Sequence, residues 1–483
     1  VPSWTRGNYG KGVGVAVLDT GVSPMADLEG RLVHGPDLSG EATLVDSYGH
    51  GTVMAGLIAG NGAASAGRVG GAYTGVAPSA HVVAVKVAGR NGVVDVSTIL
   101  QAMHWISAYR SQYGIRVMNL SWGVASTQSP TVDPINHAVQ RLWAQGIVVV
   151  VAAGNSGSAS GTITKPGDDP VVLTVGALND QGDTDLANDD VPGWSSRGPT
   201  AAGLAKPDLV APGRTVVALR SPGSAIETNY PKALVSPAYI RGSGSSQAAA
   251  VTSGAVALLL AARPSLTPDQ VKSVLMSTAA PITGVDRSIQ GRGRLQLEAA
   301  MSAVPASGSQ VSSASGTGLI DASRGAMRVV STCDGVQVEI RGEIDVRCQP
   351  WDGSRWASTA WTGDAWTGAT WTGSEWNGVA WKGVSWSSAG WDGVAWKGGT
   401  WTAGSWYGGK SWTGDVAVTS PWTGVAWKDA SWTGVAWKEA SWTTGEWTGA
   451  EFDEFLSAFW GAVPPPGKRV HGEPYTRPES ARP

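Results

Sequence analysis

The stretch GVGVAVLDTG (12–21) decides the fold class. It is a short run of β-branched and small apolar residues, and it ends in a turn that carries the carboxylate of Asp19. Continuous apolar runs, as opposed to alternating ones, predict strands that are buried on both faces. Similar runs follow at HVVAVKV (81–87), RVMNLSW (116–122), GIVVVVAAGN (146–155) and VVLTVGA (171–177).

Helical patterns lie between these strands, at HGTVMAGLIAG (50–60), VSTILQAMHWISAYR (96–110) and INHAVQRLWAQG (135–146). Strands that alternate with helices predict an α/β domain with a parallel sheet and helices on both of its faces. We expect this domain to span residues 1–302.

The chain of 483 residues is longer than one ordinary domain, and its composition changes after residue 302. Residues 303–350 begin small and polar and then alternate in hydrophobicity, which predicts a linker followed by a β hairpin that contains both cysteines. Residues 351–450 hold a tryptophan-rich repeat. Residues 451–483 hold a capping segment, EFDEFLSAFW (451–460), and a Pro-rich tail.

The repeat has a period of five residues. Of 25 tryptophans, 20 lie between 351 and 460, and Trp recurs at every fifth position twelve times from Trp351 to Trp406. This period gives no apolar stripe on a helix, and on an uninterrupted strand it places successive Trp on opposite faces. Two β-rich arrangements remain open. One is a solenoid in which each unit contains a corner, and the other is a stack of ten-residue hairpins.

Charge and hydropathy exclude several classes of partner. Lys and Arg number 35 against 38 Asp and Glu, so a nucleic-acid binder with clustered basic charge is not expected. Residues 351–450 carry six basic and eight acidic side chains, which argues against binding to a polyanion. No run of eighteen apolar residues occurs, so no transmembrane segment is expected. The first residues, VPSWTRGNYG (1–10), lack a signal-peptide pattern, so we expect a mature form without signal peptide and propeptide.

The two cysteines, Cys333 and Cys348, leave two readings open. They are either two free buried thiols or one bridge that closes a short hairpin in an oxidising compartment. Because the rest of the chain contains no cysteine, we favour the bridge. Two cysteines are too few for a four-ligand zinc site, and the sequence indicates no metal site.

Three residues carry the chemistry when they are taken together. Asp19 ends an apolar strand, His50 lies at a helix start between glycines, and Ser246 precedes a long apolar helix. Taken singly, each has an ordinary structural role: Asp19 as a turn cap, His50 as a solvent-facing residue and Ser246 as a helix cap. Together, an acid, an imidazole and a hydroxyl in this order predict a nucleophilic triad.

The motifs around these residues resemble those of the subtilisin-like serine proteases, the subtilases of peptidase family S8. The matching motifs are Asp19-Thr20-Gly21, HGTVMAG (50–56) and GSSQAAA (244–250), in which Ser245 and Ala250 replace the usual Thr and Pro. Further core-like segments are GVAPSAHVVAVKV (75–87), VMNLSWG (117–123), VVAAGNSG (150–157), WSSRGPT (194–200) and KPDLVAPG (206–213).

The resemblance implies a serine endopeptidase that cleaves peptide and protein substrates. It implies the triad Asp19, His50 and Ser246, and an oxyanion hole formed by Asn155 and the backbone N–H of Ser246. The alternative for Asn155 is a turn residue after a buried strand, but with the other motifs present we favour the catalytic role. The resemblance requires no cofactor, and it allows calcium in loops without fixing the ligands. It also implies a substrate cleft lined by Leu120, Ser121, Trp122, Gly123, Ala152, Ala153 and Gly154, in which Trp122 is bulkier than the usual aliphatic residue.

The C-terminal half resembles, in repeat style, actinobacterial secreted subtilases with Trp-rich C-terminal regions. Three hypotheses share the subtilase fold. The first is a secreted endopeptidase with an accessory repeat. The second is a structural protein that forms a homo-oligomer, filament or surface layer through the repeat. The third is a protease that binds a cell-wall polymer through rows of Trp. Fold alone does not decide among them.

Overall fold

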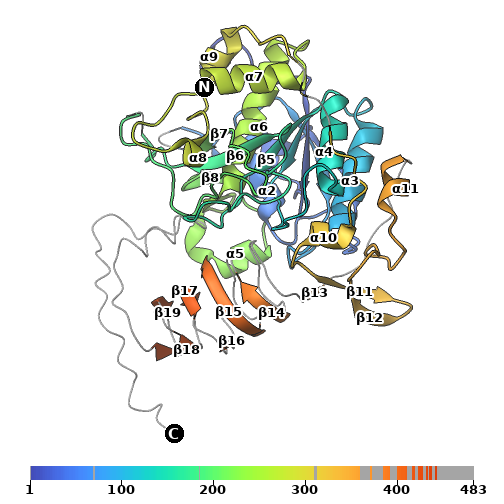
Figure 1. Cartoon of the computed structure of the whole chain (residues 1–483). Coiled ribbons are helices and arrows are strands. Elements are labelled where there is room, and N and C mark those ends of the chain that lie inside the picture. The colour runs from blue at the N-terminus through green and yellow to red at the C-terminus, as the bar shows by residue number, and fades with distance from the viewer. Residues whose placement is uncertain are drawn as a thin grey trace, which may run out of the picture.

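A sheet of seven parallel strands forms the centre of the computed structural model (Figure 1). The structure describes residues 2–68, 71–183, 185–308, 310 and 313–358, together with eight short strands between 370 and 442. The strand order is β2-β3-β1-β4-β5-β6-β7. The bounds are β1 Gly14–Asp19, β2 Leu32–Asp37, β3 His81–Lys86, β4 Ile115–Leu120, β5 Val148–Ala152, β6 Leu173–Leu178 and β7 Leu209–Pro212.

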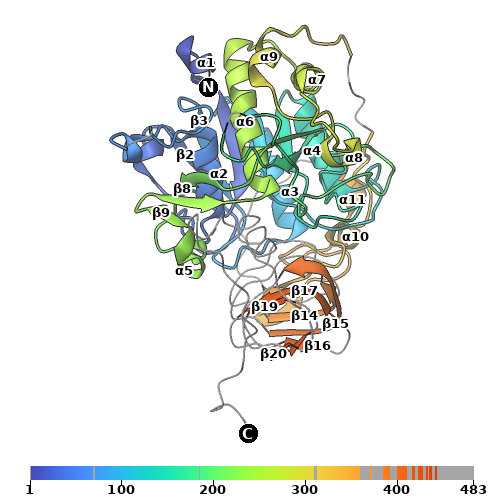
Figure 2. The ribbon, with the colours of Figure 1, turned by 90° about the vertical axis from the view of Figure 1, so that its left-hand side faces the viewer.

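Helices cover both faces of this sheet, as the sequence predicted (Figure 2). α2 (His50–Ala59) and α6 (Ser245–Ala262) pack against each other and against the sheet on one face. α3 (Val96–Tyr109) and α4 (Pro134–Ala144) pack together on the other face. The other helices of residues 1–302 are α1 Pro2–Thr5, α5 Ala225–Asn229, α7 Pro268–Thr278, α8 Arg287–Gln290 and α9 Leu297–Ser302, with short 3₁₀ turns at Ala26–Leu28, Ala63–Ser65 and Pro231–Ala233.

Local chemistry explains where the helices on the second face begin. The Asp95 carboxylate accepts a hydrogen bond from the backbone of Ser97 and caps α3. Asp133 caps α4 in the same way, and Pro134 occupies the first helical position, where its missing N–H costs nothing. Both caps lie at the carboxyl edge of the sheet, because each helix follows a strand of that sheet.

α6 is long and apolar enough to cross a bilayer by length and composition alone. In this fold, however, 83% of that apolar window is buried, and the helix contacts β4, β5, β6 and β7. It is therefore the central core helix of the domain.

A small antiparallel sheet lies beside α2. Its strands are β8 (Val216–Leu219), β10 (Tyr239–Gly242) and β9 (Leu234–Ser236), in that order. β8 contacts α2 directly, so this sheet supports the helix that begins with His50.

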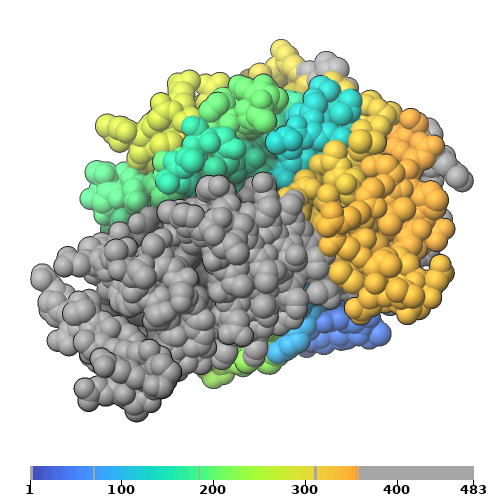
Figure 3. Space-filling view, turned by 60° about the horizontal axis from the view of Figure 1, so that its bottom comes forward, coloured from blue at the N-terminus to red at the C-terminus, as the bar shows by residue number. Residues whose placement is uncertain are grey.

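Residues 313–358 pack onto the α/β domain. They form α10 (Ile320–Arg324), β11 (Val329–Cys333), β12 (Val336–Glu339) and α11 (Gly353–Ser358). Their buried apolar side chains belong to the same core cluster as the central sheet. Cys333 and Cys348 are joined by a disulfide, as expected, with their Cα atoms 5.9 Å apart. Figure 3 shows the yellow and orange surface of these residues continuous with the cyan surface of the domain.

Short strands occur within the tryptophan repeat. β14 (Ser385–Trp391) pairs in parallel with β15 (Thr400–Lys410), so that Trp386 lies opposite Trp401. β17 (Trp422–Trp427) pairs in parallel with β19 (Val435–Trp437). The expected cap EFDEFLSAFW (451–460) and the Pro-rich tail lie outside the described residues. The other strands are β13 Thr370–Trp371, β16 Val416–Val418, β18 Ser431–Trp432 and β20 Ser441–Trp442.

Candidate active site

The three residues of the expected triad meet at the carboxyl edge of the central sheet. Asp19 is the last residue of β1, and His50 is the first residue of α2. Ser246 is the second residue of α6, which packs against α2. Polar groups gather at such an edge because the loops that leave parallel strands converge there.

His50 and Asp19 are in direct contact. The His50 Nδ1 atom lies 2.8 and 2.9 Å from the two carboxylate oxygens of Asp19. The side chains are 14% and 5% exposed, so little water screens the pair. Burial acts to lower the pKa of His50, but the charge of Asp19 and its hydrogen bond outweigh burial and raise this pKa above 6.5. The pair therefore favours the charged imidazolium and directs Nε2 away from Asp19.

A second buried carboxylate, Asp46, lies behind this pair. It accepts hydrogen bonds from the backbone of Gly49 at 2.6 Å and of Thr52 at 2.8 Å, which anchors the start of α2. It also accepts from the Thr20 hydroxyl at 2.8 Å, and Thr20 in turn accepts from the backbone of Gly51. Burial raises the pKa of Asp46 to about 6. Asp46 thus ties the chain after Asp19 to the chain around His50.

Ser246 lies at the start of α6 and is 8% exposed. Its hydroxyl donates a long hydrogen bond of 3.4 Å to the carbonyl oxygen of Ser121. Among the described residues, no hydrogen bond joins Ser246 Oγ to His50. Such contacts are often long or absent in a free enzyme and tighten when substrate binds. The Ser121 hydroxyl donates to the Ser246 carbonyl at 3.1 Å and holds the two segments together.

The side chain of Asn155 is fixed next to Ser246. Its Oδ1 atom accepts from the backbone N–H of Ser245 at 2.8 Å and from the Ser245 hydroxyl at 2.9 Å. The Ser245 hydroxyl also accepts from the N–H of Gly154 at 3.1 Å. Because Oδ1 is anchored on both bonds, the amide Nδ2 is the end that remains to donate, on the side of Gly244. An oriented amide donor beside a nucleophile is what a developing oxyanion requires.

The two segments of the expected cleft are joined through one short stretch of chain. Val124 and Lys165 exchange backbone hydrogen bonds of 3.0 and 2.9 Å. Thr164 donates its N–H to the carbonyl oxygen of Ala153 at 3.2 Å and lies against Gly123 and Gly154, where a Cβ would collide with or crowd its hydroxyl. Leu120, Ala152 and Ala153 are buried, whereas Ser121, Trp122, Gly123 and Gly154 are half-buried and line the open side.

Three residues at this site were not anticipated as functional from the sequence. Asp46 precedes Gly49, the N-cap residue of α2, and is not itself in the cap position, so its local sequence gives no signal. Ser245 was noted as a departure from the family motif and not as an anchor for Asn155. Thr164 carries no sequence signal, because its place between the two cleft segments depends on long-range packing.

A calcium ion, which the family resemblance allows, would need several oxygen ligands from the described residues. They contain no group of three or more His, Cys, Asp or Glu side chains that could hold a metal ion. The buried carboxylate of Asp27 faces N–H and O–H donors, namely Gly62, Ala64 and the Tyr239 hydroxyl. This carboxylate is therefore engaged by three protein donors and does not belong to a cluster of acidic side chains in the described part of the chain.

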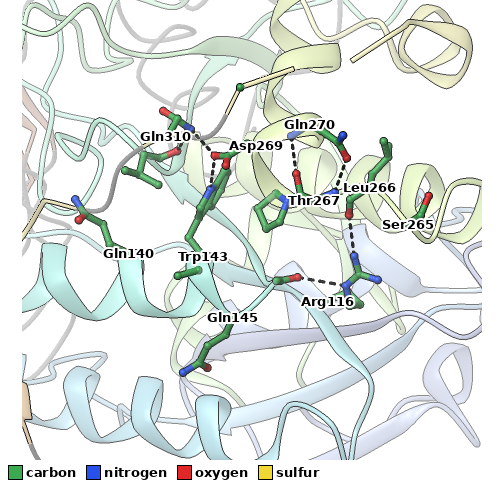
Figure 4. A pocket seen from close by; sticks show the side chains of 15 residues that line it. Arg116, Gln140, Trp143, Gln145, Ser265, Leu266, Thr267, Asp269, Gln270 and Gln310 are labelled. Carbon is green, nitrogen blue, oxygen red and sulfur yellow. Dashed lines mark hydrogen bonds between the residues drawn. The ribbon is translucent and has the colours of Figure 1, made fainter. Parts of the chain in front are cut away.

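A cavity of about 730 Å³ lies elsewhere, at the start of β4 and between α4 and α7 (Figure 4). Two of its polar side chains, Arg116 and Trp143, are already paired. The Arg116 guanidinium donates to the carbonyl oxygens of Gly146, Pro264 and Leu266, and Trp143 Nε1 donates to Asp269 at 2.8 Å. The cavity lies at the amino edge of the sheet, opposite the residues of the expected triad.

Comparisons with known proteins show which family this chain resembles. A family model described as Peptidase S8, subtilase family, matches residues 10–313. The serine protease AprX of Bacillus subtilis (strain 168) is 40% identical over 295 residues, which cover 60% of this chain and 66% of that one, just under two thirds. Subtilisin Savinase of Lederbergia lenta is 36% identical over 61% of this chain and 93% of that one. A solved cold-adapted subtilisin-like serine proteinase shares 28% identity, with a TM-score of 0.44, over 59% of this chain and 88% of that one.

Proposed function

The chain belongs to the subtilase family of serine peptidases, and from this premise we propose that it is an endopeptidase that hydrolyses peptide bonds in protein substrates. The proposed nucleophile is Ser246, the base is His50, and Asp19 orients the base. The observation that carries the proposal is the contact of His50 Nδ1 with both oxygens of Asp19 at 2.8 and 2.9 Å. This contact leaves Nε2 as the nitrogen that exchanges a proton with Ser246.

The first half of the reaction forms an acyl-enzyme. The Ser246 oxygen attacks the carbonyl carbon of the scissile bond while His50 Nε2 accepts the hydroxyl proton. Asp19 stabilises the imidazolium that results. The carbonyl oxygen becomes an oxyanion, and the Asn155 amide and the backbone N–H of Ser246 are the proposed donors to it. The intermediate collapses when His50 donates its proton to the leaving amine and the C–N bond breaks.

The second half regenerates the enzyme. A water molecule attacks the acyl carbon while His50 accepts one of its protons. The second tetrahedral intermediate then releases the carboxylic acid product, and His50 returns the proton to Ser246. The oxyanion donors serve both halves because the charge develops on the same oxygen each time.

We propose that the substrate binds as an extended strand. The backbone of segment 120–123 is the proposed partner of this added strand. The N–H and C=O groups of Ala153 and Gly154 are already bonded within the protein, so segment 152–154 is proposed to form the facing wall. The half-buried Trp122 ring packs against the core and would form one wall of an apolar subsite. The proposed substrates are therefore unfolded or extended stretches of protein.

The tryptophan repeat is proposed to form a β-solenoid that serves stability, attachment to a wall polymer or self-assembly. The parallel pairing of β14 with β15 and of β17 with β19 supports a solenoid over hairpins, because a hairpin pairs its strands antiparallel. We also propose that the protein acts outside the cell. The disulfide between Cys333 and Cys348 supports this, since disulfides persist in oxidising compartments.

The test of the peptidase is the substitution Ser246→Ala. We expect it to abolish cleavage of casein and labelling by a fluorophosphonate while circular dichroism stays unchanged. Ser302→Ala is the matched control, because Ser302 is exposed and outside the site. Casein cleavage retained by purified Ser246→Ala protein, with contaminating proteases excluded, would reject the proposed nucleophile.

A further inference from the structure

Residues 313–348, here called the clamp, extend past the family match, which ends at residue 313. They are nevertheless part of the catalytic core. Arg324 is completely buried, and so are apolar side chains along the whole segment. These side chains are Ile320, Met327, Val329, Ile340 and Val346. These buried side chains attach the segment to the core of the domain, although exposed residues such as Leu319 and Val336 lie between them.

The clamp first holds the loop that follows β3. The Arg324 guanidinium lies 2.7 Å from Asp95, and both side chains are 0% exposed. Asp95 ends this loop and caps α3, and the backbone of Val346 adds a hydrogen bond of 3.0 Å to Ser97 in the first turn. Arg324 also donates to the carbonyl oxygen of Gly342, inside the loop that the disulfide closes.

The clamp also holds the loop that follows β4. The Ser323 hydroxyl donates to Asp133, the cap of α4, at 2.8 Å. The Ser126 hydroxyl donates to the carbonyl oxygen of Ala322 at 2.7 Å. Gly325, at φ +56, lies so close to the carbonyl oxygen of Ala125 that any side chain there would collide with it. This loop begins with the cleft segment 120–123, so its far end is fixed by the clamp.

Buried polar side chains connect the clamp to the chain next to the cleft segment 120–123. Asp133 lies 3.9 Å from Lys165 Nζ, which also contacts Asp168 at 2.7 Å. Lys165 is the residue whose backbone pairs with Val124, directly after the cleft segment. Ser323, Asp133 and Lys165 are all buried. Their hydrogen bonds and charge contacts are therefore stronger than they would be in water.

We propose that the clamp is a positioning element for extended substrates: through Ser323 and Arg324 it fixes the two loops that flank Asp19, and with them the wall at 120–123. In the strand order, β3 and β4 lie on either side of β1, so the two loops that the clamp joins flank the catalytic acid. The clamp touches none of the triad residues in any described contact. Its effect therefore falls on the binding of residues remote from the scissile bond. This inference rests on the proposed peptidase function.

The test compares a long and a short substrate in the full-length enzyme. The long substrate is a tetrapeptide p-nitroanilide, and the short one is p-nitrophenyl acetate. The variants are Ser323→Ala and the more severe Arg324→Lys. The control is Arg341→Lys, which lies in the same segment with an exposed side chain paired to Glu339. Assays are run well below the melting temperature of each variant, and fluorophosphonate titration gives the concentration of active sites.

We expect Ser323→Ala to raise KM for the tetrapeptide about tenfold, while kcat changes by less than about twofold. The ester kinetics and the titration should stay unchanged, and Arg341→Lys should behave as the unmodified enzyme. If Arg324→Lys fails to fold, Ser323→Ala decides alone. An unchanged KM for the tetrapeptide, with a lowered melting temperature, would show a purely structural clamp and overturn the proposal. If the unmodified enzyme takes up no fluorophosphonate, the peptidase assignment itself fails and the clamp proposal fails with it.

Discussion

Ser245 sets the geometry of the proposed oxyanion hole without taking part in the chemistry. Its hydroxyl donates to Asn155 Oδ1 at 2.9 Å and accepts from the N–H of Gly154 at 3.1 Å. The family usually has Thr here, and the hydroxyl that Ser and Thr share is the group that makes both contacts. A change in this one hydroxyl should therefore act through the orientation of Asn155.

We predict that Ser245→Ala lowers kcat about tenfold with little change in KM, because the loss of one orienting hydrogen bond costs about 1.4 kcal/mol in the transition state. Steady-state kinetics on a peptide p-nitroanilide provides the measurement. Ser245→Thr is the matched control and should keep the activity, whereas Asn155→Ala should lose about 10²–10³ in kcat. Equal kcat in the Ser245→Ala and unmodified enzymes would contradict the anchoring role.

The acid limb of the pH profile should report His50. The base must be neutral to accept a proton. Burial acts to lower the pKa of His50, but Asp19 outweighs burial and raises this pKa above 6.5. We therefore predict that kcat/KM rises with pH through a midpoint above 6.5 and that Asp19→Asn moves this midpoint down. The same titration changes the stability of the fold in the opposite direction: activity rises with pH, whereas this contribution to stability falls. The charged pair contributes stability that is fully present below the unfolded pKa of 6.5 and is lost as pH rises through the folded pKa.

The midpoint is measured from kcat/KM between pH 5 and pH 10 in buffers of constant ionic strength. The variant Lys232→Gln, at an exposed position, controls for general changes in surface charge. A midpoint at or below 6.5 in the unmodified enzyme would contradict the stabilising role of Asp19.

At the scale of elements, the ion pair between Arg324 and Asp95 joins α10 to the start of α3. Both groups are 0% exposed. Burial acts to raise the pKa of Asp95, but the Arg324 charge and the hydrogen bonds to Asp95 outweigh burial and hold this pKa below its usual range. A buried pair of this kind adds little net stability by comparison with apolar packing, yet it is costly to break from one side. The pair therefore ties two elements that are 229 positions apart in sequence.

We predict that Arg324→Leu destabilises the protein by about 3–5 kcal/mol, because it leaves the Asp95 charge buried without a partner. The double variant Arg324→Leu/Asp95→Asn should recover most of this loss, since Asn removes the charge and still caps α3. Urea unfolding in a Ser246→Ala background, which prevents self-digestion, gives both values. Equal stability of the single and double variants would contradict an uncompensated charge as the cause.

At the scale of the whole molecule, the prediction concerns the boundary of the folded domain. The sequence predicts a domain of residues 1–302 followed by a linker, and the domain boundaries remain a prediction. The buried side chains of the clamp indicate where a cut should be harmful. Ile320, Val329, Ile340 and Val346 are each 0% exposed and belong to the main core.

We predict that a chain of residues 1–358 folds and reacts with a fluorophosphonate, whereas a chain of residues 1–302 does neither. Each buried side chain contributes about 1.5–3 kcal/mol, so the loss of four approaches the whole stability of a domain, about 5–15 kcal/mol. Circular dichroism and active-site titration check this. A folded, active 1–302 chain would contradict it. Sedimentation of the 1–358 chain and of the full-length chain then tests self-assembly. If the repeat drives self-assembly, only the full-length chain should form the larger species.

The sequence by itself determined the fold class, because buried parallel strands need continuous apolar runs such as GIVVVVAAGN (146–155), and the observed β5 (Val148–Ala152) lies inside that run. It also predicted the ends of elements where Asp19, His50 and Ser246 lie. The edge strands β2 and β7 were not predicted. β2 is half-buried along its length and contains Gly35 and Pro36, so it has neither a continuous nor an alternating pattern.

Only the tertiary structure decided which side chains support the site. Asp46, Ser245 and Thr164 lie in unremarkable local contexts, and their roles depend on contacts with segments brought close by the sheet. The place of Arg324 was also beyond the sequence, because a lone arginine in a polar helix is ordinarily solvated. Local patterns record which face of an element is buried. They do not record which distant polar group will meet it, and that is set by how the chain packs.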